Sequence, residues 1–156
     1  MAPRIRATAD ELLGAVDPSV PFDLVGALYF PLPATMIFSF MGVPREDSET
    51  LKEWCGSRAT LAWGRPTPEQ QVHDARGMAA YRGYPRQLVA SKVVARADDF
   101  ASALLAIHDE DPEALTREEI ASILFSLGFA GHETTNYLIG NMVRRLLEEP
   151  ARWERW

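Results

Sequence analysis

The residues best suited to chemistry lie in the stretch LGFAGHETTNYLIG, residues 127–140. Glu133 supplies a carboxylate that can take up or release a proton, and the adjacent hydroxyl of Thr134 can pass a proton on. Gly131 has no side chain, so a ligand can approach the backbone closely at that point. This spacing predicts a slot for a small ligand with proton-transfer groups beside it.

A long helix has to carry this slot. Thr116 and Glu119 have the spacing of an N-terminal capping box, and Pro150 supplies a stop, so we expect one helix over about 117–148, roughly 45 Å long. At 100° per residue, apolar side chains fall on two opposite sides of it, and such a helix is expected to be buried inside a larger protein. One side holds Ile120, Leu124, Leu127, Gly131, Thr134, Leu138 and Met142; the other holds Phe125, Phe129, Ile139 and Val143.

Three glycines and two threonines weaken this helix by roughly 4 kcal/mol in total, which favours a close approach to its backbone. The glycines are Gly128, Gly131 and Gly140. The hydroxyls of Thr134 and Thr135 can bond back to the carbonyls of Ala130 and Gly131 and open the helix locally. Helical phase alone leaves an alternative for Glu133, which shares a polar stripe with Glu119, Ser122 and Arg144 and can simply be solvated there.

The rest of the chain also predicts helices, so we expect an all-α fold in a single domain. A first helix is expected to begin at a Thr8 cap, and residues 17–33 are expected to form a proline-rich loop. Four further helices are expected, and Gly77, Gly83 and Pro85 are expected to weaken or split the third of them. The expected ranges are Ala34–Met41, Asp47–Ala62, Val72–Val94 and Asp98–Ile107.

Composition excludes several classes of function. The net charge of −6 over 156 residues offers no basic surface for nucleic acid. Cys55 is the only cysteine, which excludes an internal disulfide and fits a reducing, cytoplasmic location. The N-terminus lacks the pattern of a secretory signal. Pro31 and Pro33 interrupt the most apolar stretch, Leu28–Val43, so we expect no membrane-spanning segment.

The segment Ala130-Gly131-His132-Glu133-Thr134-Thr135 resembles the [AG]-G-x-[DE]-T-[TS] signature of the long central helix of the cytochrome P450 family, the haem-thiolate monooxygenases. Two further segments resemble the family in the same order along the chain. FPLPATMIFSFMGVPRED is similar to the segment before the substrate-access helices, and LLEEPARWERW is similar to the stretch after the central helix. The resemblance covers nearly the whole chain.

The resemblance implies a role for each residue of the slot. Ala130 and Gly131 would lie against haem b and leave room for dioxygen, with Thr135 beside them in the cofactor-binding segment. Thr134 would hydrogen-bond the iron-bound oxygen or its partner water, and Glu133 would relay protons from solvent. His132 is expected to point away and to be structural or exposed. The implied partners are a small organic substrate, dioxygen, and a ferredoxin- or flavodoxin-type electron donor with its NAD(P)H-dependent reductase.

The chain also departs from the family pattern. The family's haem ligand is a cysteine thiolate in a glycine-rich loop well after the central helix, and Cys55 lies before that helix without such a loop. Cys55 is therefore interpreted as a small buried hydrophobe. We expect residues 1–156 to be the middle portion of a monooxygenase, lacking an N-terminal sheet and a C-terminal haem-ligand region. On its own the chain is not expected to form a thiolate-ligated haem.

Two other classes of function stay open at this point. A non-catalytic helical interaction protein, or a degenerate remnant, would expose apolar surface and associate through it. A zinc hydrolase is suggested by His132-Glu133, which begins an H-E-x-x-H motif, but Asn136 stands where the second histidine belongs.

Overall fold

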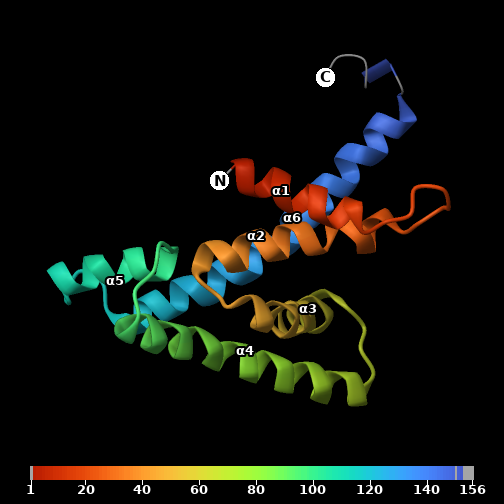
Figure 1. The fold of residues 1–156 in the computed structure, drawn as a ribbon. Helices are drawn as coiled ribbons and strands as arrows, with labels where there is room; N and C mark the ends of the chain where they lie inside the picture. Colours follow the sequence, from red (N-terminus) through yellow and green to blue (C-terminus); the bar gives the residue numbers. More distant parts are fainter. Residues whose placement is uncertain (1, 150, 153–156) are drawn as a thin grey trace. The chain divides into compact units, whose positions relative to one another are not determined.

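The computed structural model describes residues 2–149 and 151–152, and every regular element among them is a helix (Figure 1). This confirms the all-α prediction. The described chain forms two compact units, one of them Ile37–Ala130 and the other made of the residues before and after it. The elements are α1 (Ala2–Gly14), the π-helical η1 (Val25–Tyr29), α2 (Pro31–Met41), the 3-10 helix η2 (Arg45–Asp47), α3 (Ser48–Trp63), α4 (Pro68–Val94), α5 (Phe100–Glu110) and α6 (Arg117–Glu148).

The bounds predicted for the central helix, 117–148, are those of α6. Its start is the capping box expected from sequence. The Glu119 backbone N–H donates to the Thr116 hydroxyl at 3.2 Å, and the Glu119 carboxylate accepts from the Thr116 backbone N–H at 2.8 Å. Pro150, the expected stop, lies outside the described residues.

Prolines interrupt the chain less than the sequence predicts. Residues 17–33 are not all loop, because η1 forms within them and α2 begins at Pro31. A proline in a first helical turn loses no hydrogen bond, since that N–H has no helical partner in any case. Thr8 does not cap a helix either: α1 begins at Ala2 and runs through it.

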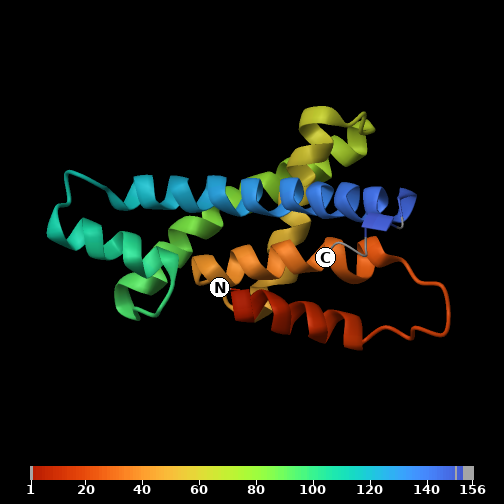
Figure 2. The ribbon, with the colours of Figure 1, turned by 90° about the horizontal axis from the view of Figure 1, so that it is seen from above.

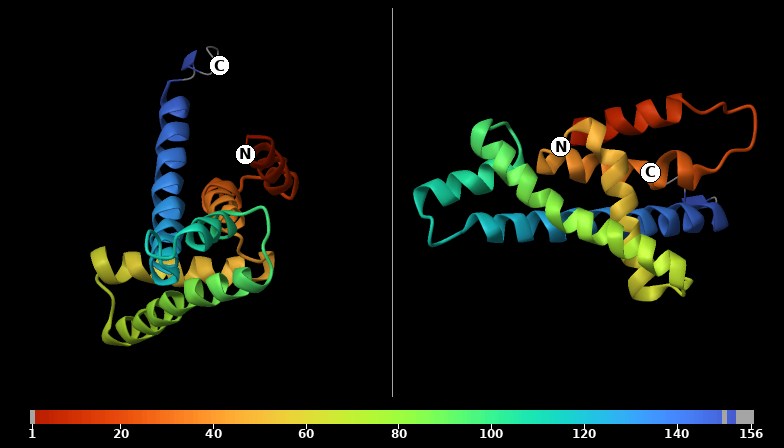
Figure 3. Two further views of the ribbon diagram at one scale, coloured as in Figure 1. Left: turned by 90° about the vertical axis from the view of Figure 1, so that its left-hand side faces the viewer. Right: turned by 90° about the horizontal axis from the view of Figure 1, so that it is seen from below.

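Pro85 lies inside α4, which continues from Pro68 to Val94 without a break (Figure 3). An interior proline costs about 3 kcal/mol. Tyr81, Leu88 and Val89 are buried with Pro85, and burial of each large apolar side chain contributes roughly 1.5–3 kcal/mol. Tertiary packing therefore outweighs the local penalty that led us to expect a split helix.

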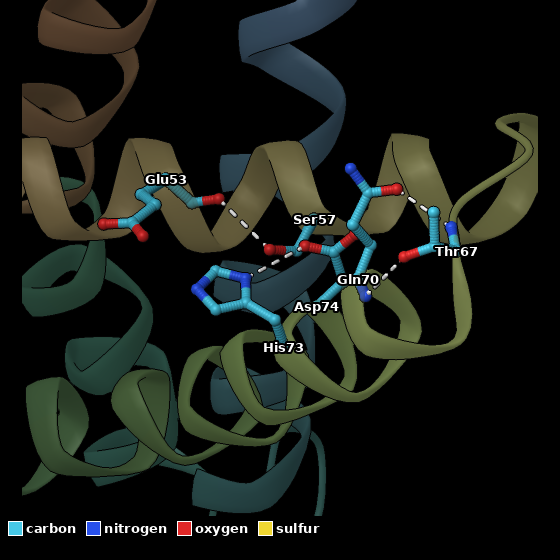
Figure 4. Close-up of polar contacts among 6 residues, drawn as sticks. All are labelled: Glu53, Ser57, Thr67, Gln70, His73 and Asp74. Carbon is cyan, nitrogen blue, oxygen red and sulfur yellow. Dashed lines mark hydrogen bonds and ion pairs between the residues drawn. The ribbon is translucent and has the colours of Figure 1, made fainter.

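Two features hold the N-terminal part of α4 in place: a cap made by its own residues, and packing against α3, which lies beside it (Figure 1). Thr67 and Gln70 form a reciprocal capping box (Figure 4). Gly77 lets the two helices approach, because a Cβ at that position would lie 3.0 Å from the Ser57 hydroxyl oxygen. That hydroxyl donates to the Glu53 carbonyl at 3.4 Å, so its polar group is satisfied within α3 (Figure 4).

The core of the Ile37–Ala130 unit draws on every α-helix that passes through that unit. Its largest side chains with less than 2% exposure are Phe38, Met41, Leu51, Tyr81, Leu105, Ile120 and Leu124. In the other unit α1 packs against η1 (Figure 2), and the Tyr29 side chain of η1 is buried. No helix in the described part of the chain is both long enough and apolar enough to cross a bilayer.

A partly buried ion pair joins α4 to the start of α5. The Lys92 ammonium lies 2.6 Å from the Asp99 carboxylate, with side-chain exposures of 14% and 5%. Asp99 also caps α5 by accepting from the Ser102 backbone N–H at 2.8 Å. Gly42 adopts φ +90 against this carboxylate, and any larger side chain at residue 42 would collide with it. Burial raises the pKa of Asp99, but hydrogen bonds from Lys92 and Ser102 outweigh burial and leave that pKa below its usual value.

We predict that Asp99→Asn lowers the free energy of unfolding by about 2 kcal/mol at pH 7, because the partly buried Lys92 loses its charged partner. The pKa of Asp99 is lower in the folded chain, so this contribution is complete above the unfolded-state pKa of about 4. It is lost as the pH falls through the native pKa. Urea denaturation at several pH values measures the difference.

The matched control is Asp109→Asn, which breaks the exposed 2.6 Å pair with Arg96. Such a pair contributes about 0.5 kcal/mol or less. Equal losses in the two variants, or a difference for Asp99→Asn that does not vary with pH, would contradict this account of the α4–α5 junction.

Candidate functional site

The predicted site residues lie on one continuous helix, α6, with different exposures. Ala130 and Thr134 are exposed, four residues apart, so both lie on one side of the helix. Gly131, Glu133 and Thr135 are half-buried. The side of α6 that carries Ala130 and Thr134 is therefore accessible in this chain.

The back-bond predicted for Thr135 is confirmed. Its hydroxyl donates to the Gly131 carbonyl at 3.1 Å. Such a bond from the side chain to the residue four positions earlier competes with the helix ladder and tends to bend a helix. The corresponding bond from Thr134 to Ala130 stays a prediction, as do the roles assigned to Glu133 and Thr134.

His132 is structural. Its side chain is fully buried, and its ring meets the Phe30 ring edge-on at a centroid distance of 4.9 Å and an interplanar angle of 68°. Edge-to-face pairs of this kind add about 0.5–1.5 kcal/mol to the effect of burial. Of the two outcomes expected for His132, the exposed one is wrong. A buried ring cannot open a hydrolytic metal site to substrate.

A surface hollow of about 650 Å³ runs along α6 up to Ala130, within the Ile37–Ala130 unit. Its lining is mainly apolar, with two serine hydroxyls and one carboxylate. The lining residues are Leu115, Glu119, Ser122, Ile123, Ser126, Leu127 and Ala130. Ile123 is 38% exposed and Ala130 is also exposed, so this hollow offers apolar and small side chains to a ligand.

Two of the three glycines face protein side chains, which corrects our interpretation that all three make room for a ligand. A Cβ on Gly128 would lie 2.5 Å from the Tyr81 hydroxyl oxygen. A Cβ on Gly140 would lie 3.6 Å from the Tyr29 ring, which is an ordinary contact distance. Gly128 therefore makes room for the Tyr81 hydroxyl, and Gly131 is the glycine of the three that we still expect to make room for a ligand.

The other side of α6 carries contacts that the sequence analysis did not identify. The Tyr81 hydroxyl donates to the Phe125 carbonyl at 2.8 Å, and the two rings lie 4.9 Å apart. The Arg58 guanidinium lies 3.8 Å from the centre of the Phe129 ring, a cation–π contact. Periodicity along one helix cannot reveal partners contributed by α3 and α4.

Cys55 is fully buried, as expected for a small hydrophobe. It is close enough to the Tyr81 hydroxyl to raise the pKa of that group. A thiol enclosed in this way cannot reach a ligand on the exposed side of α6. Across the described residues, no group of three or more histidine, cysteine, aspartate or glutamate side chains is arranged to hold a metal ion.

The chain is similar to known proteins over almost all of its length, although no family model matches it. It is 36% identical over 155 residues to an erythromycin C-12 hydroxylase of Saccharopolyspora erythraea, covering 99% of this chain and 38% of that protein. It is 35% identical over 150 residues to a vitamin D(3) 25-hydroxylase of Pseudonocardia autotrophica, covering 96% of this chain and 36% of that protein. The chain thus spans little more than a third of the length of these relatives.

Solved structures give the same result. The chain superposes on the cytochrome P450 CREJ, in complex with (4-ethylphenyl) dihydrogen phosphate, with a TM-score of 0.86 and 35% identity over 98% of this chain and 38% of that one. The chain also superposes on P450BioI, in complex with an acyl carrier protein carrying hexadec-9Z-enoic acid. The TM-score is 0.83 and the identity 31%, over 98% of this chain and 39% of that one. The fold is therefore that of one part of the bacterial cytochrome P450s.

We predict that the Cys55 thiol of the native chain reacts with a water-soluble disulfide reagent many times more slowly than in denaturant, because it is fully buried. Absorbance of the released thiolate measures both rates. Cys55→Ala should leave any haem spectrum of the protein unchanged. A prompt reaction in the native state, or a Soret band that depends on Cys55, would show that this thiol is available as a ligand.

Proposed function

We propose that this chain, which has the fold of one part of the bacterial cytochrome P450s, forms the oxygen-binding wall of a haem-dependent monooxygenase. The observation that carries the proposal is the exposed side of α6, where the small side chain of Ala130 and the hydroxyl of Thr134 lie four residues apart. When haem is bound in such a protein, it activates dioxygen so that one oxygen atom is inserted into an organic substrate.

The residues of this side of α6 fit one face of a haem. Ile123, Leu127, Ala130 and Thr134 follow helical spacing along a single stripe, and none of them is buried in this chain. A flat apolar macrocycle would cover such a stripe and remove it from water, while Ala130 and Gly131 leave space above the surface. The fit concerns this face alone, because Cys55 is enclosed and cannot serve as the thiolate on the opposite face.

Thr134 and Glu133 would handle protons at this surface. The exposed Thr134 hydroxyl can donate one hydrogen bond and accept others, so it can bind a water or pass on a proton beside bound dioxygen. Glu133 is half-buried and can exchange protons with solvent while staying next to Thr134. Thr135 is committed to the Gly131 carbonyl and acts on backbone shape.

The remaining partners are also part of the proposal. A small organic substrate would lie near Thr134, on the same exposed side of α6, where it can meet the activated oxygen. A ferredoxin- or flavodoxin-type donor, with an NAD(P)H-dependent reductase, would supply electrons, and the protein would work in the cytoplasm. The likeness to bacterial hydroxylases supports the class of reaction and does not specify the substrate.

A second candidate is a non-catalytic protein that associates through apolar surface. Leu138 and Met142 on α6 are 67% and 54% exposed and lie four residues apart, and Tyr137 is also 67% exposed. Exposed patches of this kind favour association. Size-exclusion chromatography with a hydrophobic dye tests this candidate. Aggregates that bind the dye indicate an uncovered piece of a larger protein. A compact monomer that binds none indicates an independent helical domain and contradicts association through this surface.

We predict that the 156-residue chain mixed with haem shows no thiolate-type Soret band in a carbon monoxide difference spectrum. A chimaera in which residues 1–156 replace the aligned 38% of the erythromycin C-12 hydroxylase should show that band, because the remaining part supplies the ligand loop. A thiolate band from the chain alone, or its absence from a folded chimaera, would overturn the proposal.

In the same chimaera, Thr134→Ala should lower the rate of product formation by about 10²-fold, since a positioned proton-transfer group contributes at least that much. Two electrons from the donor should then reduce dioxygen, with two protons, to hydrogen peroxide, which a peroxidase assay measures. Thr134→Ser keeps the hydroxyl and should restore most of the activity. Equal rates for the alanine variant and the parent would remove Thr134 from the mechanism.

A further inference from the structure

The side of α6 that is packed against protein contains an unusual contact one turn before Ala130. The Tyr81 hydroxyl donates a 2.8 Å hydrogen bond to the Phe125 carbonyl, which is an acceptor of the α6 ladder. In an α-helix this carbonyl also accepts the backbone N–H four residues further on, which is that of Phe129. The Tyr81 hydroxyl therefore binds an acceptor that already takes part in the α6 ladder.

Gly128 makes this contact possible. A Cβ at residue 128 would lie 2.5 Å from the Tyr81 oxygen, a separation that packed atoms do not tolerate. Tyr81 cannot move aside easily, because its side chain is 1% exposed and its ring packs on Phe125. The next nearest atoms to that Cβ belong to Met41, at 3.4 Å. The hydroxyl of Tyr81 and the missing side chain of Gly128 are thus complementary in shape.

The surroundings keep the hydroxyl protonated. Burial raises the pKa of Tyr81 far above its ordinary value, and the neighbouring Cys55 thiol raises it further. A buried phenol that stays neutral keeps its proton available for the Phe125 carbonyl. Leaving that phenol without a partner in this environment would cost more than the bond itself contributes, so the geometry is firmly held.

We propose that the Tyr81 hydroxyl is a positioning group for α6: it holds the Phe125–Phe129 turn in place and thereby sets the backbone position of Ala130, with Gly128 as the opening that admits it. The link to oxygen chemistry rests on the proposed function, in which Ala130 lies against haem. The contact itself stands on Tyr81, Phe125 and Gly128 alone.

The first test measures how Gly128→Ala shifts the urea midpoint in two backgrounds. The direction of that shift should depend on whether Tyr81 is present. In the parent chain, Gly128→Ala should lower the urea midpoint, because the new methyl group collides with the Tyr81 oxygen. In a Tyr81→Phe background the same substitution should raise the midpoint, because the oxygen is gone and alanine favours the helix. A shift in the same direction in both backgrounds would overturn the pairing.

The second test locates the effect on α6. In the isotopically labelled 156-residue chain, Tyr81→Phe should speed amide exchange at Phe129 about fivefold, the effect of losing one ordinary hydrogen bond. It should also shift the Ala130 methyl resonance. Tyr84→Phe is the matched control, because Tyr84 lies on the same helix and donates a 2.6 Å hydrogen bond to Asp47, away from α6.

Tyr84→Phe should lower the urea midpoint while leaving Phe129 exchange and the Ala130 resonance as in the parent. If both tyrosine variants alter the α6 signals equally, Tyr81 acts only on general stability and the proposal fails. If Gly128→Ala prevents folding in the parent, its recovery in the Tyr81→Phe background still gives the expected result. None of these measurements uses haem, so they can fail while the proposed function holds, or succeed while it fails.

Discussion

The two sides of α6 meet opposite physical requirements, and the arrangement of its neighbours follows from them. One side must be fixed by protein contacts, because a helix of 32 residues with three glycines in its middle has weak intrinsic stability. The other side must stay uncovered if a flat cofactor is to reach Ala130 and Thr134. Within the Ile37–Ala130 unit, α3 and α4 provide the fixing contacts through Arg58 and Tyr81. The side chains on the open side are small or only partly covered.

Buried polar groups define positions in this fold, whereas apolar burial supplies most of the stabilisation. Fully buried side chains such as Phe38 and Leu105 can be exchanged for others of similar volume at modest cost. The Tyr81 hydroxyl and the Asp99 carboxylate cannot, because each meets its partners at hydrogen-bond distance and would be costly if left alone. Each of the two also has a glycine beside it, Gly128 and Gly42, that leaves room for the polar atom. At both positions, a buried polar side chain and the neighbouring glycine therefore depend on each other.

The likeness to bacterial cytochrome P450s extends over almost the whole chain but only 38% of the erythromycin C-12 hydroxylase. Leu138 and Met142, on the C-terminal half of α6, are exposed. From the sequence we expected α6 to be buried inside a larger protein, and within this chain that half is exposed. One face of a haem site works only when the opposite face supplies the ligand, so the chemistry proposed for Thr134 needs a thiolate that the buried Cys55 cannot provide.

Local sequence signals determined the helical class, the bounds of α6, its capping box and the back-bond from Thr135 to Gly131, because each depends on residues within one or two turns. Helical phase grouped Thr134 with Ile120 and Leu124, which are buried, and so it did not single out the exposed side that carries Ala130 and Thr134. Local signals failed at Pro85, at Gly128 and at the exposed alternative for His132, where the deciding partners are distant in sequence. Tyr81 lies 44 residues before Phe125, and no periodicity connects them. Propensity acts along the chain, but only packed side chains decide whether a glycine admits a ligand or a tyrosine, and packing exists only in the tertiary structure.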